Sequence, residues 1–179
     1  MSFKKTFLPA VILATICLLC AAALAVTHTA TKERIAFVER ERYFADARSV
    51  MPAGTVLEEL DITGVEGFVG KDTEGEPTGY VIRTSAKGYG GNVSCVVGFD
   101  TSGKLIGLSV RAPDETPGLG VNVKNPGFTD QFVGAEKPPV LFSDVDGVTG
   151  ATYSSRAVTT AVTQAFLQLE ALMKGGAIK

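Results

Sequence analysis

The chain of 179 residues has no tryptophan, one histidine and three cysteines. A single histidine offers too few ligands for a zinc site. The formal net charge is only −2, so the sequence lacks the basic excess that favours nucleic acid as a partner. These shortages argue against a metal centre and against a nucleic-acid-binding protein.

The few cysteines and the single histidine do not form a cluster in the sequence. Cys17 and Cys20 have the spacing of a redox pair, but both lie in an apolar run, where we interpret them as small apolar residues. Cys95 stands alone in an expected strand, so we predict that it is buried. His28 lies just beyond the apolar run, and we predict that it is a surface residue.

The apolar run from Phe7 to Val26 carries no charge. As a helix at ~1.5 Å per residue it would span ~30 Å, the thickness of the hydrocarbon core of a bilayer. We favour a retained anchor over a cleaved signal peptide, because the run exceeds the usual signal core of ~7–15 apolar residues. A lipoprotein signal is less favoured, because Cys20 follows a leucine instead of a small residue.

The charges around this run predict a membrane topology. Lys4 and Lys5 favour a cytoplasmic N-terminus, although Lys32, Arg34 and Arg40 follow on the other side and weaken the bias. Long domains cross the membrane largely regardless of such charges. We therefore expect a single-pass protein of the cell membrane. Its expected parts are a cytoplasmic tail (1–6), a transmembrane helix (7–26), a stalk or packing helix (27–52) and an extracytoplasmic domain (53–179).

The domain reads as a mixed α+β fold with a mainly antiparallel sheet and packed helices. Short apolar and β-branched runs predict strands at Val56–Ile62, Gly79–Ser85, Val93–Phe99 and Lys104–Val110. The sequence DTSG at 100–103 predicts a hairpin turn, and KGYGG at 87–91 predicts a break between strands. An irregular stretch at 112–124, a short helix opened by Pro126 and a short strand at Val140–Phe142 should follow.

The last segment, Ser154–Lys174, has the pattern of an amphipathic helix. Ser154 or Ser155 can cap its start, and Gly175 with Gly176 can end it. Its apolar stripe consists of Val158, Ala161, Val162, Ala165, Phe166, Leu169, Leu172 and Met173.

The segment GVTGATYSS, 147–155, crowds glycines and hydroxyl residues ahead of this helix. A helix start presents unpaired amide donors that suit a phosphate, so the segment is a candidate anion site. From the residues alone, an ordinary serine-capped turn is favoured over the anion site. A Thr or Ser hydrolase is disfavoured, because no histidine lies in the domain to activate a hydroxyl.

Two blocks in this part of the chain resemble a known family. DGVTGATYSS, 146–155, resembles the flavinylation signature of FMN-binding domains, in which the threonine after Gly-Ala carries FMN. GYGG, a hairpin and then ETPGLG, in this order, resemble the G subunit of Rnf electron-transport complexes. The C subunit of the sodium-pumping NADH:quinone reductase shares the signature, but this chain is short for that protein.

The resemblance implies covalent FMN in a phosphoester to Thr152, added from FAD by a separate flavin transferase with magnesium. Thr149, Gly150 and Ala151 then form the turn around the attachment point, while Ser154 and Ser155 bond the phosphate or cap the helix. The ETPGLG block and the glycine-rich GYGG block would supply walls of the flavin pocket. The implied wall residues are Glu115, Thr116, Pro117, Gly118, Leu119, Gly120 and Tyr89.

The implied function is electron transfer within a membrane-bound, ion-translocating ferredoxin:NAD oxidoreductase complex, with no turnover by this chain alone. Its partners would be the polytopic and iron–sulfur or flavin subunits of an Rnf complex. The alternatives are the reductase C subunit and a non-redox, membrane-tethered binding module of the same fold. The cofactor, if present, carries the redox chemistry, and the protein binds and tunes it.

Overall fold

The computed structural model describes residues 3–60, 62 and 64–174, without the side chains of residues 3–6. It divides into two units, the N-terminal helix up to Arg42 and a domain from Tyr43 onward. The glycines predicted to stop the last helix, Gly175 and Gly176, lie outside the described residues.

The first unit belongs to one continuous helix, α1 (Phe3–Ser49), which covers both the apolar run and the expected stalk. Its most apolar 18-residue window has a mean hydropathy of 2.6, which makes it long and apolar enough to cross a membrane. The hydroxyls of Thr15, Thr27 and Thr29 donate to carbonyls four residues earlier at 2.8–2.9 Å. Of these three, Thr15 lies within the apolar run, where the bond satisfies a hydroxyl that lipid cannot solvate. The length and hydropathy of α1 suggest a membrane anchor.

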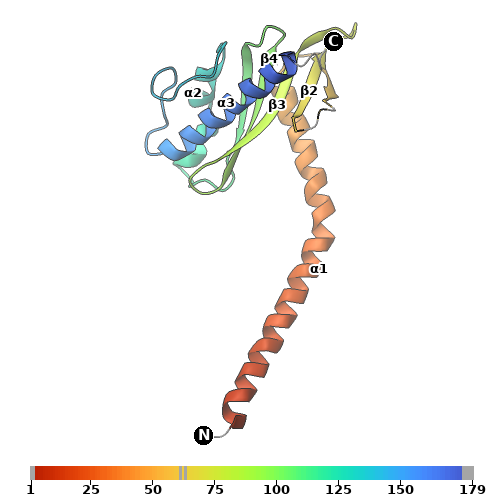
Figure 1. Cartoon of the computed structure of the whole chain (residues 1–179), viewed down its shortest axis with the longest axis vertical. Helices are drawn as coiled ribbons and strands as arrows, with labels where there is room; N and C mark the ends of the chain where they lie inside the picture. Colours follow the sequence, from red (N-terminus) through yellow and green to blue (C-terminus); the bar gives the residue numbers. More distant parts are fainter. Residues whose placement is uncertain (1–2, 61, 63, 175–179) are drawn as a thin grey trace. The chain divides into compact units, whose positions relative to one another are not determined.

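The second unit is an antiparallel sheet in the order β1-β2-β3-β4-β5, with helices packed on it (Figure 1). The strands are β1 (Val56–Glu59), β2 (Glu66–Lys71), β3 (Pro77–Lys87), β4 (Asn92–Asp100) and β5 (Leu105–Arg111). After β5 come the short helices η1 (Gly120–Lys124), α2 (Pro126–Thr129) and η2 (Asp130–Phe132), then α3 (Thr152–Lys174). The predicted α+β class with an antiparallel sheet is confirmed.

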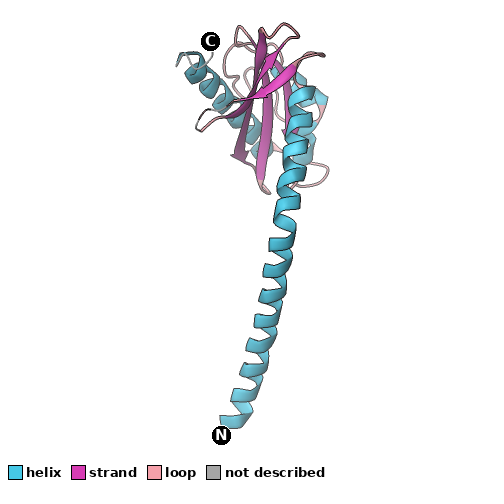
Figure 2. Cartoon of the chain, turned by 90° about the vertical axis from the view of Figure 1, so that its right-hand side faces the viewer, coloured by secondary structure: helices cyan, strands magenta, loops and turns pink. Residues whose placement is uncertain are grey.

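Alternation along the central strands produces two hydrophobic cores, one on each face of the sheet. Tyr80 and Ile82 point to the larger core, which α3 covers, while Val81 between them points to the smaller core. The smaller core is closed by Ala47 at the end of α1 and by Val50. Figure 2 shows the strands lying between α3 and the last turns of α1. An ion pair between Arg111 and Asp46 ties the end of α1 to β5.

Cys95 lies in the larger core with no exposed surface, as predicted. Burial raises the pKa of its thiol to about 12, so it stays neutral and unreactive at physiological pH.

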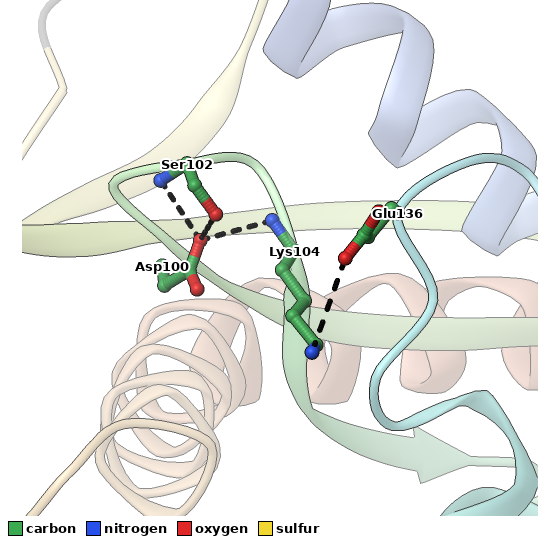
Figure 3. A network of polar contacts seen from close by, with 4 residues as sticks. All are labelled: Asp100, Ser102, Lys104 and Glu136. Atoms are coloured by element: carbon green, nitrogen blue, oxygen red, sulfur yellow. Dashed lines mark hydrogen bonds and ion pairs between the residues drawn. The ribbon is translucent and has the colours of Figure 1, made fainter.

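The β4–β5 hairpin has the predicted turn at Asp100–Gly103. The Asp100 carboxylate accepts hydrogen bonds from the Ser102 hydroxyl at 2.6 Å and from the Lys104 amide at 3.0 Å (Figure 3). Burial alone would raise the pKa of Asp100, but these hydrogen bonds lower it below its ordinary value. The Lys104 ammonium also lies 4.0 Å from Glu136, which follows the short helices.

One strand was missed, and two local predictions were wrong. Strand β2 was not predicted, because Gly67 and Gly70 have no side chains and so interrupt the alternation of apolar and polar residues that marks a strand. The strand expected at Val140–Phe142 is a tight turn instead, in which the Asp144 carboxylate accepts the Val140 amide at 2.8 Å. The chain there forms only an isolated bridge between Leu141 and Val145. Met173, placed on the apolar stripe of α3, is 47% exposed, while the other predicted stripe residues are buried.

Candidate functional site

The segment 147–155 leads directly into α3, which begins at Thr152 instead of Ser154. Gly150 has φ = 77°, a conformation that glycine adopts without strain. The Ala151 carbonyl then accepts the Ser155 amide at 2.9 Å, which closes the first turn of the helix. Thr152 is therefore the first residue of α3, and its side chain is exposed.

The two serines are not helix caps, which corrects the prediction. Both lie inside the first turn of α3 and are buried, with exposed fractions of 2% for Ser154 and 0% for Ser155. The Ser155 hydroxyl accepts the amide of Val148 at 3.0 Å, which fastens the preceding loop to the helix. The sequence shows a hydroxyl near a helix start, but the hydrogen bond to Val148 depends on how the loop folds back.

Glu115, the first residue of ETPGLG, is the point where three segments meet. Its carboxylate is buried, with 3% of the residue exposed. One oxygen, Oε1, accepts the Tyr89 amide at 2.8 Å and the Gly90 amide at 3.4 Å. The other, Oε2, accepts the Ser154 hydroxyl at 2.8 Å. One carboxylate thus joins the GYGG turn, the ETPGLG block and the start of α3.

The Glu115 side chain fits only because glycines surround it. A Cβ on Gly88 would lie 2.0 Å from Oε1, and a Cβ on Gly120 would lie 2.4 Å from Oε2. Any side chain at either position would displace the carboxylate. The glycines of the two blocks therefore make room for a buried polar group, which explains why glycine-rich segments far apart in sequence come together here.

Glu115 also lines a pocket with a volume of about 350 Å³. This volume is within the range of small-molecule sites, ~300–1,000 Å³. Its lining residues are Tyr89, Glu115, Thr116, Leu119, Gly120, Gly150, Ala151, Thr152, Tyr153 and Ser154. The structure thus brings together the three sequence blocks that were expected to form one site.

Four of the expected site residues do not line this pocket: Thr149, Ser155, Pro117 and Gly118. Thr149 is exposed in the turn, and Pro117 and Gly118 shape the bend of ETPGLG. Conversely, Tyr153 lines the pocket and was not predicted as a site residue. The available signal was an aromatic side chain beside Thr152, at a position that the family signature leaves free.

The residues that line the pocket offer apolar surface and a hydroxyl group to a ligand. Leu119 and two tyrosine rings offer apolar surface, while Thr152 offers a hydroxyl at an exposed edge. Among the residues that the structure describes, no three His, Cys, Asp or Glu side chains group into a metal site. The only histidine, His28, belongs to the other unit. The pocket therefore offers both apolar and polar surface to a ligand, next to the start of α3.

Comparisons with known proteins agree with this description. The profile of the FMN-binding domain family matches residues 88–166, which include all three blocks of the pocket. The profile of the RnfG N-terminal region matches residues 1–42. The domain is therefore an FMN-binding domain that follows an N-terminal apolar helix.

Relatives that match most of the chain identify the family. The G subunit of the ion-translocating oxidoreductase complex of Methanosarcina acetivorans is 30% identical, over 79% of this chain and 82% of that protein. The G subunit of the Na⁺-translocating ferredoxin:NAD⁺ oxidoreductase complex of Acetobacterium woodii is 26% identical, over 96% and 95%. The chain belongs to the RnfG family, the G subunits of ion-translocating oxidoreductase complexes.

A solved structure is more distantly similar. The crystal structure of the C subunit of the Na⁺-translocating NADH-quinone reductase from Parabacteroides distasonis is 23% identical, with a TM-score of 0.49. The match covers 62% of this chain and 61% of that one.

Proposed function

We propose that this chain is an electron-transfer subunit that carries FMN covalently, through a phosphoester to the hydroxyl of Thr152. The observation that carries the proposal is the position of Thr152. It is the first residue of α3, it is exposed, and it lines the pocket that the GYGG and ETPGLG blocks complete. A threonine in this place is accessible to a modifying enzyme and also adjacent to a pocket for the attached group.

The surroundings of Thr152 fit a modification made by another enzyme. A threonine hydroxyl is a weak nucleophile without a neighbouring base, and the only histidine lies outside the domain. A flavin transferase acting on FAD would supply the base. The Thr152 oxygen bonds to the phosphorus of the FMN half, AMP leaves, and the hydroxyl proton passes to the transferase. The small residues Gly150 and Ala151 leave space for its approach.

The start of α3 suits the product of this reaction. The phosphodiester keeps one negative charge, and the first amides of a helix lack partners within the helix. These amides and the positive end of the helix dipole favour an anion at this place. The Ser154 hydroxyl already donates to Glu115, and the Ser155 hydroxyl, which accepts the Val148 amide, has no exposed surface. We therefore assign the phosphate to backbone donors instead of serine hydroxyls.

We infer that α1 anchors the protein in the cell membrane with the FMN-binding domain on the extracytoplasmic side. The apolar window of α1 supports the anchor, and Lys4 and Lys5 before the span favour a cytoplasmic N-terminus. Alkaline phosphatase fused to the C-terminus should be active, because this enzyme folds only outside the cytoplasm. An inactive fusion, with an active cytoplasmic reporter at the same position, would reverse the topology.

We further infer that the chain works inside a multisubunit Rnf complex that couples ferredoxin:NAD oxidoreduction to ion translocation, as the name of the Acetobacterium woodii relative states for that protein. Electrons would enter and leave through the polytopic and the iron–sulfur or flavin subunits. The bound flavin supplies the redox chemistry, while the chain positions it and holds it at the membrane.

Covalent flavin is tested by fluorescence in a denaturing gel. The full chain, coexpressed with a flavin transferase, should give a fluorescent band that co-migrates with the protein. Thr152→Ala should abolish the band, and Thr149→Ala, three residues away on the same turn, should leave it unchanged. A dark wild-type band would overturn the proposal. Fluorescence that survives in Thr152→Ala and disappears in Thr149→Ala would move the attachment to Thr149.

A further inference from the structure

Two exposed aromatic side chains meet at the pocket. Tyr153 is 66% exposed and Tyr89 is 73% exposed, and both line the pocket. Their ring centroids are 6.2 Å apart, with an angle of 47° between the ring planes. The other two tyrosines of the chain, Tyr43 and Tyr80, pack into the hydrophobic cores. The aromatic surface that the tyrosines leave open to solvent is thus gathered at one place.

Glu115 forms hydrogen bonds with the segments that carry both rings. Its Oε1 accepts the backbone amide of Tyr89, and its Oε2 accepts the hydroxyl of Ser154, the residue after Tyr153. One buried carboxylate therefore holds the backbone of Tyr89 and the side chain of the residue that follows Tyr153. Exposed single aromatic residues are common and need no explanation. Here two exposed aromatic rings lie against each other at the edge of a pocket, and one buried carboxylate bonds to Tyr89 and to Ser154, the residue after Tyr153.

The geometry of the pair limits how a flat ligand can bind. A ring inserted between two others needs about 7 Å between them, two layers at the ~3.5 Å contact distance of carbon atoms. The 6.2 Å separation and the inclined planes leave no such slot. A flat ligand in this pocket therefore does not fit between the two rings, and it can stack only on the open face of one of them.

This inference rests on the function proposed above. We propose that Tyr153, braced by Tyr89, is the wall on which the isoalloxazine ring of the Thr152-bound FMN stacks. The attachment point is the preceding residue, so the tether keeps the flavin beside this wall. Tyr153 is then a flavin-binding residue specific to sequences that place an aromatic side chain directly after the attachment threonine.

Stacking on a phenol has a spectroscopic signature. An excited flavin takes an electron from an adjacent phenol ring and returns it, so that the emission is lost with no net oxidation. A phenylalanine ring stacks in the same way but is much harder to oxidise. Tyr153→Phe therefore separates the position of the ring from its ability to quench.

The test uses the full chain, flavinylated by coexpression and purified in detergent. The flavin emission lifetime should rise several-fold in both Tyr153→Phe and Tyr153→Ala. The visible circular dichroism of the flavin should be retained in Tyr153→Phe and weakened in Tyr153→Ala, because only alanine removes the wall. Gln164→Ala, an exposed change on α3 away from the pocket, is the matched control and should behave like the wild type.

The outcomes separate the two proposals. Covalent flavin with the same lifetime in the wild type and in Tyr153→Phe would overturn the stacking and leave the attachment at Thr152 intact. No covalent flavin in the wild type would overturn the proposed function and this inference with it. If Tyr153→Ala is not flavinylated, the lifetime of Tyr153→Phe decides by itself.

Discussion

The segment 147–155 carries hydroxyl groups on its outer edge and on its inner side, and the two sets differ in burial and in hydrogen bonding. On the outer edge, the hydroxyls of Thr149 and Thr152 are exposed. On the inner side, Ser154 and Ser155 are buried and bonded to Glu115 and to the Val148 amide. The comparison shows that burial separates two exposed threonine hydroxyls, which a modifying enzyme can reach, from two serine hydroxyls whose hydrogen bonds hold the segment in place.

The largest expected effect comes from removing the carboxylate that joins the three segments of the site. Glu115→Ala would leave the Tyr89 amide and the Ser154 hydroxyl without their acceptor, and it would open a cavity beneath the pocket. We expect a loss of about 3 kcal/mol in the free energy of unfolding, measured by urea titration of the full chain in detergent.

Glu115→Gln is the matched control, because it keeps the shape and one acceptor oxygen. Its loss should be about 1 kcal/mol, the difference between a charged and a neutral acceptor. If alanine and glutamine cost the same small amount, the carboxylate does not join the three segments as described.

A smaller effect is expected at the serine that fastens the loop. Ser155→Ala leaves the Val148 amide without the hydroxyl that accepts it at 3.0 Å. An unsatisfied donor of this kind costs about 1–3 kcal/mol, and the same urea titration measures it. Thr160→Ala, an exposed hydroxyl further along α3, should cost much less. Equal losses at both positions would contradict the contrast between the buried and exposed hydroxyls.

Gly150→Ala tests the turn that separates the two sets of hydroxyls. Gly150 has φ = 77°, and a Cβ there would lie 3.2 Å from the Leu119 side chain. Left-handed backbone costs a residue with a side chain about 1–2 kcal/mol. Thermal unfolding of the full chain should show the loss. A variant as stable as the wild type would mean that the turn tolerates another conformation.

The smallest effect is expected on the outer edge. Thr149 is exposed and does not line the pocket, so Thr149→Ala should change the free energy of unfolding by less than about 0.5 kcal/mol. A clear destabilisation in the urea titration would place Thr149 among the residues that hold the segment in place instead.

The sequence predicted the elements with strong periodic patterns and missed those without one. Strands β3, β4 and β5 and the helix α3 have β-branched or amphipathic runs, and all four were located within a few residues. Strand β2 was missed, because its two glycines interrupt the alternation. The start of α3 was placed too late, because small hydroxyl residues favour a cap as readily as a first helical turn.

The sequence predicted which segments form the site, but not the hydrogen bonds that join these segments. The resemblance brought GYGG, ETPGLG and GATYSS to one cofactor, and the structure places residues of all three around one pocket. Glu115 was expected to face the flavin. The sequence could not show that Gly88 and Gly120, which lie far apart in the chain, make room for the buried Glu115 carboxylate. When two segments far apart in the chain approach closely in the fold, neither segment shows it in its own sequence.

The central claim, attachment of FMN to Thr152, is tested most directly by tandem mass spectrometry of the wild-type chain coexpressed with a flavin transferase. Trypsin cleaves after Arg156, so one peptide contains both Thr149 and Thr152. Fragmentation should place the FMN phosphate on Thr152, with Thr149 unmodified. The phosphate on Thr149, or a peptide carrying no flavin while the transferase modifies another substrate in the same cells, would contradict the account.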